Sequence, residues 1–267
     1  MPIISVRDVV VEYEGRRVLD GVNLDVEPGQ VTVLLGGSGS GKSTLLRQIL
    51  GLQRPQSGTI EIMGTDITRC SQQELTKIRR SIGVAFQSAA LFNSLTLEEN
   101  VALNLQEHTA LAPSIIDLIV WMKLAVVGLA DFGKLRPQEL SGGMKKRAAV
   151  ARALALDPEI LVLDEPSAGL DPIVAAELDQ LILFLKDTFQ ITALVVTHEL
   201  SSAFTIADRI AMLFNGKFLA VGTKDEIRAS QDPRVRQFLN RVPDNPVHAP
   251  AVAAYIDQYV RGPGATS

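Results

Sequence analysis

The stretch Gly36-Gly37-Ser38-Gly39-Ser40-Gly41-Lys42-Ser43 says more about the fold of this chain than any other part of its sequence. The loop matches the pattern G-x-x-x-x-G-K-[ST] at every required position. The apolar run Val31–Leu35 precedes it and has the composition of a strand buried on both faces, and residues 43–52 after it look helical. A Gly-Ser-rich linker is the alternative, but a linker would not lie between a buried strand and an apolar helix. The context therefore predicts a phosphate-binding loop.

The chemistry of such a loop follows from its residues. Glycines let backbone N–H groups turn toward one point, and a helix that starts at the loop adds unpaired N–H groups and a positive dipole end. Lys42 would place its charge on the β- and γ-phosphates of a nucleotide, and Ser43 would offer its hydroxyl to Mg²⁺. Thr44 follows on the same helix and is included among the nucleotide-binding candidates.

Two further apolar runs end in polar residues that suit the same chemistry. Residues 160–163 run into Asp164 and Glu165, and residues 191–197 run into His198. The ends of parallel strands meet at the ligand-binding edge of α/β sheets. We therefore expect Asp164 to hold Mg²⁺, Glu165 to act as general base on the attacking water and His198 to contact the γ-phosphate. The alternatives are an ordinary surface acid pair and a structural histidine.

Strand-like and helix-like segments alternate along the chain, which predicts an α/β fold with a parallel core. Residues 3–13 and 18–26 read as N-terminal strands, and residues 172–189 and 199–207 look helical after buried strands. The strand signal then disappears from the middle of the chain, so residues 88–157 are interpreted as a mostly helical insertion.

Composition excludes several classes of protein. The chain has 267 residues and a net charge of −4, so it lacks the basic surplus of a nucleic-acid binder. Its single cysteine, Cys70, rules out an internal disulfide, and the histidines lie far apart in sequence, so no Cys/His metal cluster is expected. The most apolar stretch, residues 115–130, is interrupted by Asp117 and Lys123, and the N-terminus lacks a signal-peptide pattern. We therefore expect a cytoplasmic protein that reaches a membrane only through a partner.

A second helix begins at residues 140–144, and together with the motifs above it indicates one protein family. The chain resembles ABC-type ATPases, because the phosphate loop and Asp164-Glu165 are joined by the signature Leu140-Ser141-Gly142-Gly143-Met144. Other family positions are matched in order by Tyr13 (adenine stacking), Gln87 (Q-loop), Ser167-Ala168-Gly169-Leu170-Asp171 (D-loop) and His198 (switch histidine). The resemblance implies a P-loop NTPase (RecA-like) parallel core, an N-terminal antiparallel β subdomain and a helical signature subdomain. It places the ATPase cassette at residues 1–230 and a C-terminal tail with short helices at residues 231–267.

The resemblance also implies how the motifs work. Two head-to-tail copies would hold ATP between the phosphate loop of one and the signature of the other, where Ser141, Gly142 and Gly143 begin a second anion-binding helix. The implied catalytic residues are Glu165, His198, Lys42 and Gln87. The implied Mg²⁺ ligands are Ser43, Gln87 and Asp164. ATP and Mg²⁺ are the implied cofactors, and the implied reaction is ATP hydrolysis coupled to transport.

Met144 indicates which group within the family the chain resembles most. Most relatives carry glutamine at this position, whereas Ser-Gly-Gly-Met followed by basic residues resembles the ATPases of Mla/Mce-type phospholipid transporters. Further stretches that agree are residues 86–92, 106–109, 122–124 and 232–239. The implied partners are a second copy of the chain, an integral membrane permease, a periplasmic Mce-domain lipid-binding protein and a small cytoplasmic regulatory subunit. The implied location is the cytoplasmic face of the bacterial inner membrane, and no nucleic acid is implied.

Three other functions compete with this one. An importer cassette for amino acids or other small solutes would share all the core motifs. An ABC ATPase acting on DNA would insert a long coiled coil before the signature, and one acting on ribosomes would usually carry two cassettes; neither feature is present. A nucleotide-binding scaffold without turnover disagrees with the intact set Lys42, Asp164, Glu165 and His198.

Several surface features stay open. Phe86, Leu91, Phe92 and Leu95 belong either to the core or to an interface with the coupling helix of a permease. Residues 145–147, Lys-Lys-Arg, are interpreted as a solvated helix face. In the tail, residues 234–241 and 252–260 carry apolar stripes, and because such short helices are unstable alone we predict that they dock on their own cassette or on the opposite one.

Overall fold

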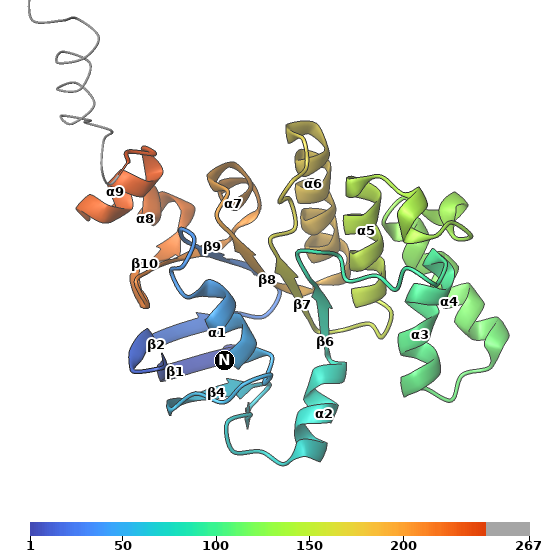
Figure 1. The fold of residues 1–267 in the computed structure, drawn as a ribbon, viewed down its shortest axis with the longest axis horizontal. Coiled ribbons are helices and arrows are strands. Elements are labelled where there is room, and N and C mark those ends of the chain that lie inside the picture. The colour runs from blue at the N-terminus through green and yellow to red at the C-terminus, as the bar shows by residue number, and fades with distance from the viewer. Residues whose placement is uncertain (244–267) are drawn as a thin grey trace, which may run out of the picture. The chain divides into compact units, whose positions relative to one another are not determined.

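The computed structural model describes residues 1–243, and Figure 1 shows the order of its elements. The chain divides into two units, one formed by Met1–Ser230 and a second that begins at Gln231. All the elements described next, except the last helix, belong to the first unit.

The centre of the first unit is a six-stranded sheet with the order β10-β9-β3-β8-β7-β6. Every neighbouring pair in it is parallel except β9 with β10. The predicted parallel α/β core is therefore confirmed. The strands are β3 (Val31–Leu35), β6 (Ile82–Ala85), β7 (Ile160–Asp164), β8 (Thr192–Thr197), β9 (Arg209–Phe214) and β10 (Lys217–Thr223).

A second sheet has four strands in the order β2-β1-β4-β5, all antiparallel. Its strands are β1 (Ile4–Tyr13), β2 (Arg16–Val26), β4 (Ser57–Ile62) and β5 (Thr65–Asp66). One hydrophobic cluster joins this sheet to the parallel sheet, for example through Ile4, Ile60, Leu45 and Val162. The removal of these side chains from water contributes roughly 1.5–3 kcal/mol per fully buried large apolar residue. The structure thus confirms the N-terminal antiparallel subdomain.

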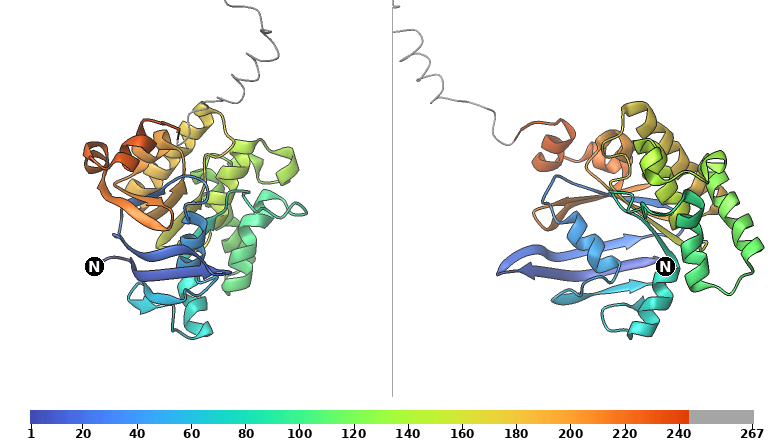
Figure 2. Two further views of the ribbon diagram at one scale, coloured as in Figure 1. Left: turned by 60° about the vertical axis from the view of Figure 1, so that its left-hand side comes forward. Right: turned by 45° about the vertical axis from the view of Figure 1, so that its right-hand side comes forward.

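The helices fall into two groups. Those associated with the sheets are α1 (Lys42–Ile49), α2 (Gln72–Arg80), α6 (Pro172–Phe189), α7 (Leu200–Ile206) and α8 (Lys224–Ala229). The helical insertion holds α3 (Leu97–His108), α4 (Pro113–Val126) and α5 (Gly142–Ala153), with short 3₁₀ turns at Ala130–Phe132 and Pro137–Glu139. Figure 2 shows the green helices of the insertion gathered on one side, away from the blue strands β1 and β2.

Side-chain caps explain where several helices begin. Thr96 and Glu99 form a reciprocal capping box at α3, and Ser71 and Glu74 form another at α2. Asp171 accepts hydrogen bonds from two backbone N–H groups at the start of α6, directly before Pro172. No helix within residues 1–243 is long and apolar enough to cross a membrane.

The structure adds elements that the sequence patterns left unassigned. Residues 53–86 contain β4, β5, α2 and β6, and residues 208–223 contain β9 and β10. Strand β6 has only four residues, too few for a clear alternation, and its position in the sheet depends on pairing with the distant strand β7.

The second unit contributes one described helix, α9 (Pro233–Leu239), which Asp232 caps through the N–H groups of residues 234 and 235. This helix agrees with the one expected over residues 234–241. The other expected tail helix, residues 252–260, lies outside the described residues, and the docking of the tail stays a prediction.

Gly83 marks the closest approach between β6 and the last turn of α5. A Cβ atom added there would lie 2.3 Å from the carbonyl oxygen of Ala153. We expect Gly83→Ala to lower the free energy of unfolding by about 1–3 kcal/mol, because backbone must move to make room. Urea denaturation without nucleotide measures this. Gly37→Ala is the control, since an added Cβ there meets nothing within 4 Å; equal stability of the two variants would contradict the argument.

Candidate functional site

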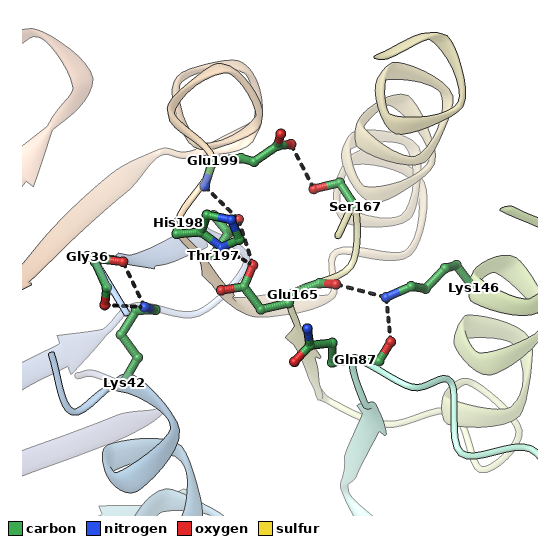
Figure 3. A network of polar contacts seen from close by, with 10 residues as sticks. Gly36, Lys42, Gln87, Lys146, Glu165, Ser167, Thr197, His198 and Glu199 are labelled. Atoms are coloured by element: carbon green, nitrogen blue, oxygen red, sulfur yellow. Dashed lines mark hydrogen bonds and ion pairs between the residues drawn. The ribbon is translucent and has the colours of Figure 1, made fainter. Parts of the chain in front are cut away.

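The residues singled out as a nucleotide site come from four neighbouring strand ends. In sheet order, the carboxyl ends of β3, β8, β7 and β6 lead into the phosphate loop, His198, Glu165 and Gln87. These strands are parallel, so all four ends lie at one edge of the sheet. Figure 3 shows Lys42, Glu165, His198 and Gln87 at this edge.

The phosphate loop ends where α1 begins. Gly41 is the residue before the helix and has a φ of 109°, which only glycine adopts without strain. The buried ammonium of Lys42 donates to the carbonyl oxygens of Gly36 (2.7 Å) and Gly37 (3.0 Å). Burial lowers the pKa of Lys42, and the negative charges of Glu165 and Asp164 oppose this shift.

One polar atom in this loop is buried without a partner. The Ser40 hydroxyl makes no hydrogen bond to any residue in the part of the chain that the structure describes. A buried hydroxyl is costly in that condition, and a phosphate oxygen would satisfy it. The loop therefore has both the charge and the unused donor that a phosphate group requires.

Glu165 has a strained backbone conformation. Its φ is +47°, in the left-handed region that non-glycine residues rarely adopt. Its backbone N–H donates to the carbonyl oxygen of Val196 on β8 (2.8 Å). Its Oε2 lies 2.9 Å from His198 Nδ1 and 3.4 Å from the Thr197 hydroxyl. Strain of this kind persists only where the surrounding structure enforces it, which is typical of functional residues.

The contact with Glu165 restricts what His198 can do. When Glu165 is a carboxylate it only accepts hydrogen bonds, and the proton of this contact is then on His198 Nδ1. In the neutral ring Nε2 is then an acceptor. His198 can donate to a phosphate only if the ring is charged or turns away from Glu165.

The expected magnesium ligands provide oxygen atoms alone: the Ser43 hydroxyl, the Gln87 side-chain amide and the Asp164 carboxylate. Oxygen ligands suit Mg²⁺, which usually completes its shell with water and substrate phosphates. Within residues 1–243 no three His, Cys, Asp or Glu side chains form a metal cluster. The pKa of Asp164 is raised by burial and then by Glu165, while Lys42 and Lys146 oppose the shift.

Lys146 corrects the interpretation of residues 145–147 as a solvated helix face. Its side chain is buried, and its ammonium donates to the carbonyl oxygens of Gln87 (2.6 Å) and Glu165 (2.9 Å), as Figure 3 shows. The helical spacing of Lys146 could have indicated that it is buried. Lys146 is three residues after Gly143 and four before Val150, and both of these are buried.

The sequence analysis also missed a contact between Ser167 and Glu199. The Ser167 hydroxyl, in the segment matched to the D-loop, donates to Glu199 Oε2 (3.2 Å), and the Glu199 N–H donates to the Thr197 hydroxyl (3.0 Å). These bonds connect the segment after β7 with the segment after β8. Spacing along the sequence could not reveal a contact between them.

Tyr13 lies at the end of β1 with its side chain 41% exposed, and its hydroxyl donates to Gln53 Oε1 (2.5 Å). The ring is therefore accessible for stacking against a base, while its polar end is held.

The signature forms a separate helix start. Ser141 caps α5 by accepting a hydrogen bond from the Met144 N–H (3.2 Å), and Gly142 is exposed. Within one chain this helix start is separated from the phosphate loop: α5 packs against β6, whereas α1 follows β3, and β8 and β7 lie between those strands. The N-termini of α1 and α5 thus lie at different places in one chain.

Comparison with known proteins establishes the class. The chain belongs to the ABC transporter family, whose model matches residues 19–168. The cassette MJ0796, solved as a dimer in a post-hydrolysis state bound to ADP and Pi, has a TM-score of 0.76 and 33% identity over 83% of this chain and 98% of that one. The chain is an ABC ATPase, the ATP-binding and ATP-hydrolysing subunit of a transporter.

Two groups of similar proteins indicate which kind of transporter subunit the chain resembles. The intermembrane phospholipid transport system ATP-binding protein MlaF of Haemophilus influenzae is 42% identical over 92% of this chain and 93% of its own length. The probable ribonucleotide transport ATP-binding protein mkl of Mycobacterium leprae is 46% identical over 89% of this chain. The chain covers 68% of that longer protein. The similarity to MlaF confirms the resemblance to Mla-type ATPases.

Proposed function

We propose that this chain powers phospholipid transport between the inner membrane and a periplasmic Mce-domain partner, and so maintains outer-membrane lipid asymmetry. The observation that carries the proposal is the match to MlaF along nearly the full length of both chains, together with the Ser-Gly-Gly-Met signature. Ribonucleotide transport is the second candidate, because the mkl relative carries that name and is slightly more identical.

In the proposed reaction, the phosphate loop holds ATP through its N–H groups and the Lys42 charge, and Tyr13 stacks on the adenine. Glu165 accepts a proton from the attacking water at its carboxylate, while Thr197 and His198 hold that carboxylate in place. Mg²⁺ held by Ser43, Gln87 and Asp164 would neutralise charge on the phosphates.

The two separate anion-binding helix starts support a head-to-tail dimer. Ser141, Gly142 and Gly143 of one copy would face the γ-phosphate held by the loop of the other copy. The cassette MJ0796 was solved as a dimer, which supports the pairing of two copies. ATP would then join the two copies, and hydrolysis would separate them.

A hollow of about 380 Å³ offers a docking site for the permease. Phe86 (38% exposed) and Phe92 (51% exposed) line it, whereas Leu91 and Leu95 are half-buried. Its lining includes three arginines, Arg79, Arg80 and Arg152, which give it positive charge. These features fit a short helix with apolar and acidic side chains, which we propose belongs to the membrane partner.

We expect the double variant Phe86→Ala, Phe92→Ala to reduce co-purification of the permease at least about 10-fold, since exposed aromatic anchors carry much of an interface's energy. ATP affinity should not change. Phe184→Ala is the matched control, because Phe184 is a similarly exposed aromatic residue on α6 (47%) that does not line the hollow. Full retention of the permease by the double variant would contradict the docking proposal.

The substrate is tested by purifying the tagged chain from detergent-solubilised membranes and identifying the proteins and lipids that accompany it. A permease, an Mce-domain protein and enriched phospholipid are expected, followed by ATP-dependent lipid transfer in vesicles. A permease with a solute-binding protein and no enriched lipid would favour ribonucleotides or another small solute.

A further inference from the structure

The signature helix α5 contacts the catalytic edge of its own chain, in addition to beginning at the signature. Lys146 donates to the carbonyl oxygens of Glu165 and Gln87, two residues on different loops. Six residues later, Arg152 donates to the carbonyl oxygens of Ala89 (3.1 Å) and Ala90. Two cations on one helix therefore hold both loops by their main chain.

The held segments are strained. Ala89 (φ 62°), Ala90 (φ 48°) and Glu165 (φ 47°) all adopt the left-handed region although none of them is glycine. Such residues cost of order 1 kcal/mol or more each and relax unless neighbouring contacts hold them. Lys146 and Arg152 are among those contacts, and for Glu165 they add to the bond from its N–H to Val196.

The burial of Lys146 argues that its role is specific. A buried ammonium is costly unless hydrogen bonds replace its lost hydration, and here the carbonyl oxygens of Gln87 and Glu165 accept those bonds. Burial lowers the pKa of Lys146, and Glu165 and Asp164 are the charges that oppose this shift. The position therefore carries a desolvation cost beside Glu165 and Asp164.

We propose that Lys146 is a positioning residue for ATP hydrolysis, because it fixes the main chain at Glu165 and Gln87. The segment after β7, which carries Glu165, would then move together with the signature helix α5 of the same chain. The inference rests on the proposed role of Glu165 as general base. It explains how movement of the helical insertion, which carries both the signature and one wall of the permease hollow, reaches the water-activating carboxylate.

The test compares three variants of the full chain, assayed alone and in the complex that co-purifies with it. Lys146→Met should lower kcat about 10–100-fold, as expected for a misplaced catalytic group. KM and the affinity for a fluorescent ATP analogue should stay within about 3-fold. Tm should fall by no more than a few degrees, because the loss of two hydrogen bonds to carbonyl oxygens is partly offset by the removal of a buried charge. Lys146→Arg should recover most of kcat, since a guanidinium can donate to both carbonyls. Lys77→Met removes an exposed charge on α2 and should behave like the parent.

The outcomes separate this inference from the proposed function. An unchanged kcat in Lys146→Met would overturn the inference, and so would a parallel loss of kcat, ATP affinity and Tm, which would mean a purely structural role. Failure of Lys146→Arg to recover activity would also count against it. Turnover that persists in Glu165→Gln would instead overturn the role of Glu165 itself.

Discussion

Glu165→Gln is expected to bind ATP normally and to lose about 10²–10⁴-fold in turnover. The amide has the shape of the carboxylate and can still accept from the Thr197 hydroxyl, which lies 3.4 Å from Glu165 Oε2. It cannot take a proton from water. Because ATP would persist between the two copies, the ATP-bound dimer should also last longer.

Steady-state phosphate release and equilibrium ATP binding measure the two halves of this prediction. The matched control is Glu159→Gln, which removes an exposed carboxylate just before β7, at the opposite end of the strand from Glu165. Parent-like turnover in Glu165→Gln within the assembled complex would exclude Glu165 as the general base.

Lys42→Ala is expected to weaken ATP binding itself by about 10–100-fold, the equivalent of one strong charge-assisted hydrogen bond. The Lys42 ammonium is buried and held by two loop carbonyls, so it lies where a phosphate must be received. Its removal should not unfold the chain, because a buried charge is lost with it.

Isothermal titration with ATP and a thermal melt without nucleotide distinguish lost binding from lost folding. Lys77→Ala, an exposed lysine on α2, controls for the change in net charge. Near-normal ATP affinity in Lys42→Ala, with an intact melt, would refute the assigned role.

The two predictions rest on different kinds of evidence. Lys42 could be assigned from its neighbours alone, since strand, loop and helix follow one another directly and backbone geometry brings their groups together. The contact between Glu165 and His198 joins residues 33 positions apart, so it depends on β7 pairing with β8. The apolar runs 160–163 and 191–197 indicated that both residues follow strands at one edge of the sheet, but not that they lie 2.9 Å apart.

Local order in the sequence indicated the phosphate loop, the strands β3, β7 and β8 and the helix α6, because short-range periodicity and turn residues specify these features directly. The family was indicated by the resemblance of several motifs in their order along the chain. Tertiary structure alone decided the short strand β6, the burial of Lys146 and the bonds that this residue makes to Gln87, 59 positions away, and to Glu165. A lysine on a helix is exposed by default. Whether it is buried depends on which carbonyl groups the rest of the chain brings to it, and that is settled only when distant strands pair and the helix packs against them.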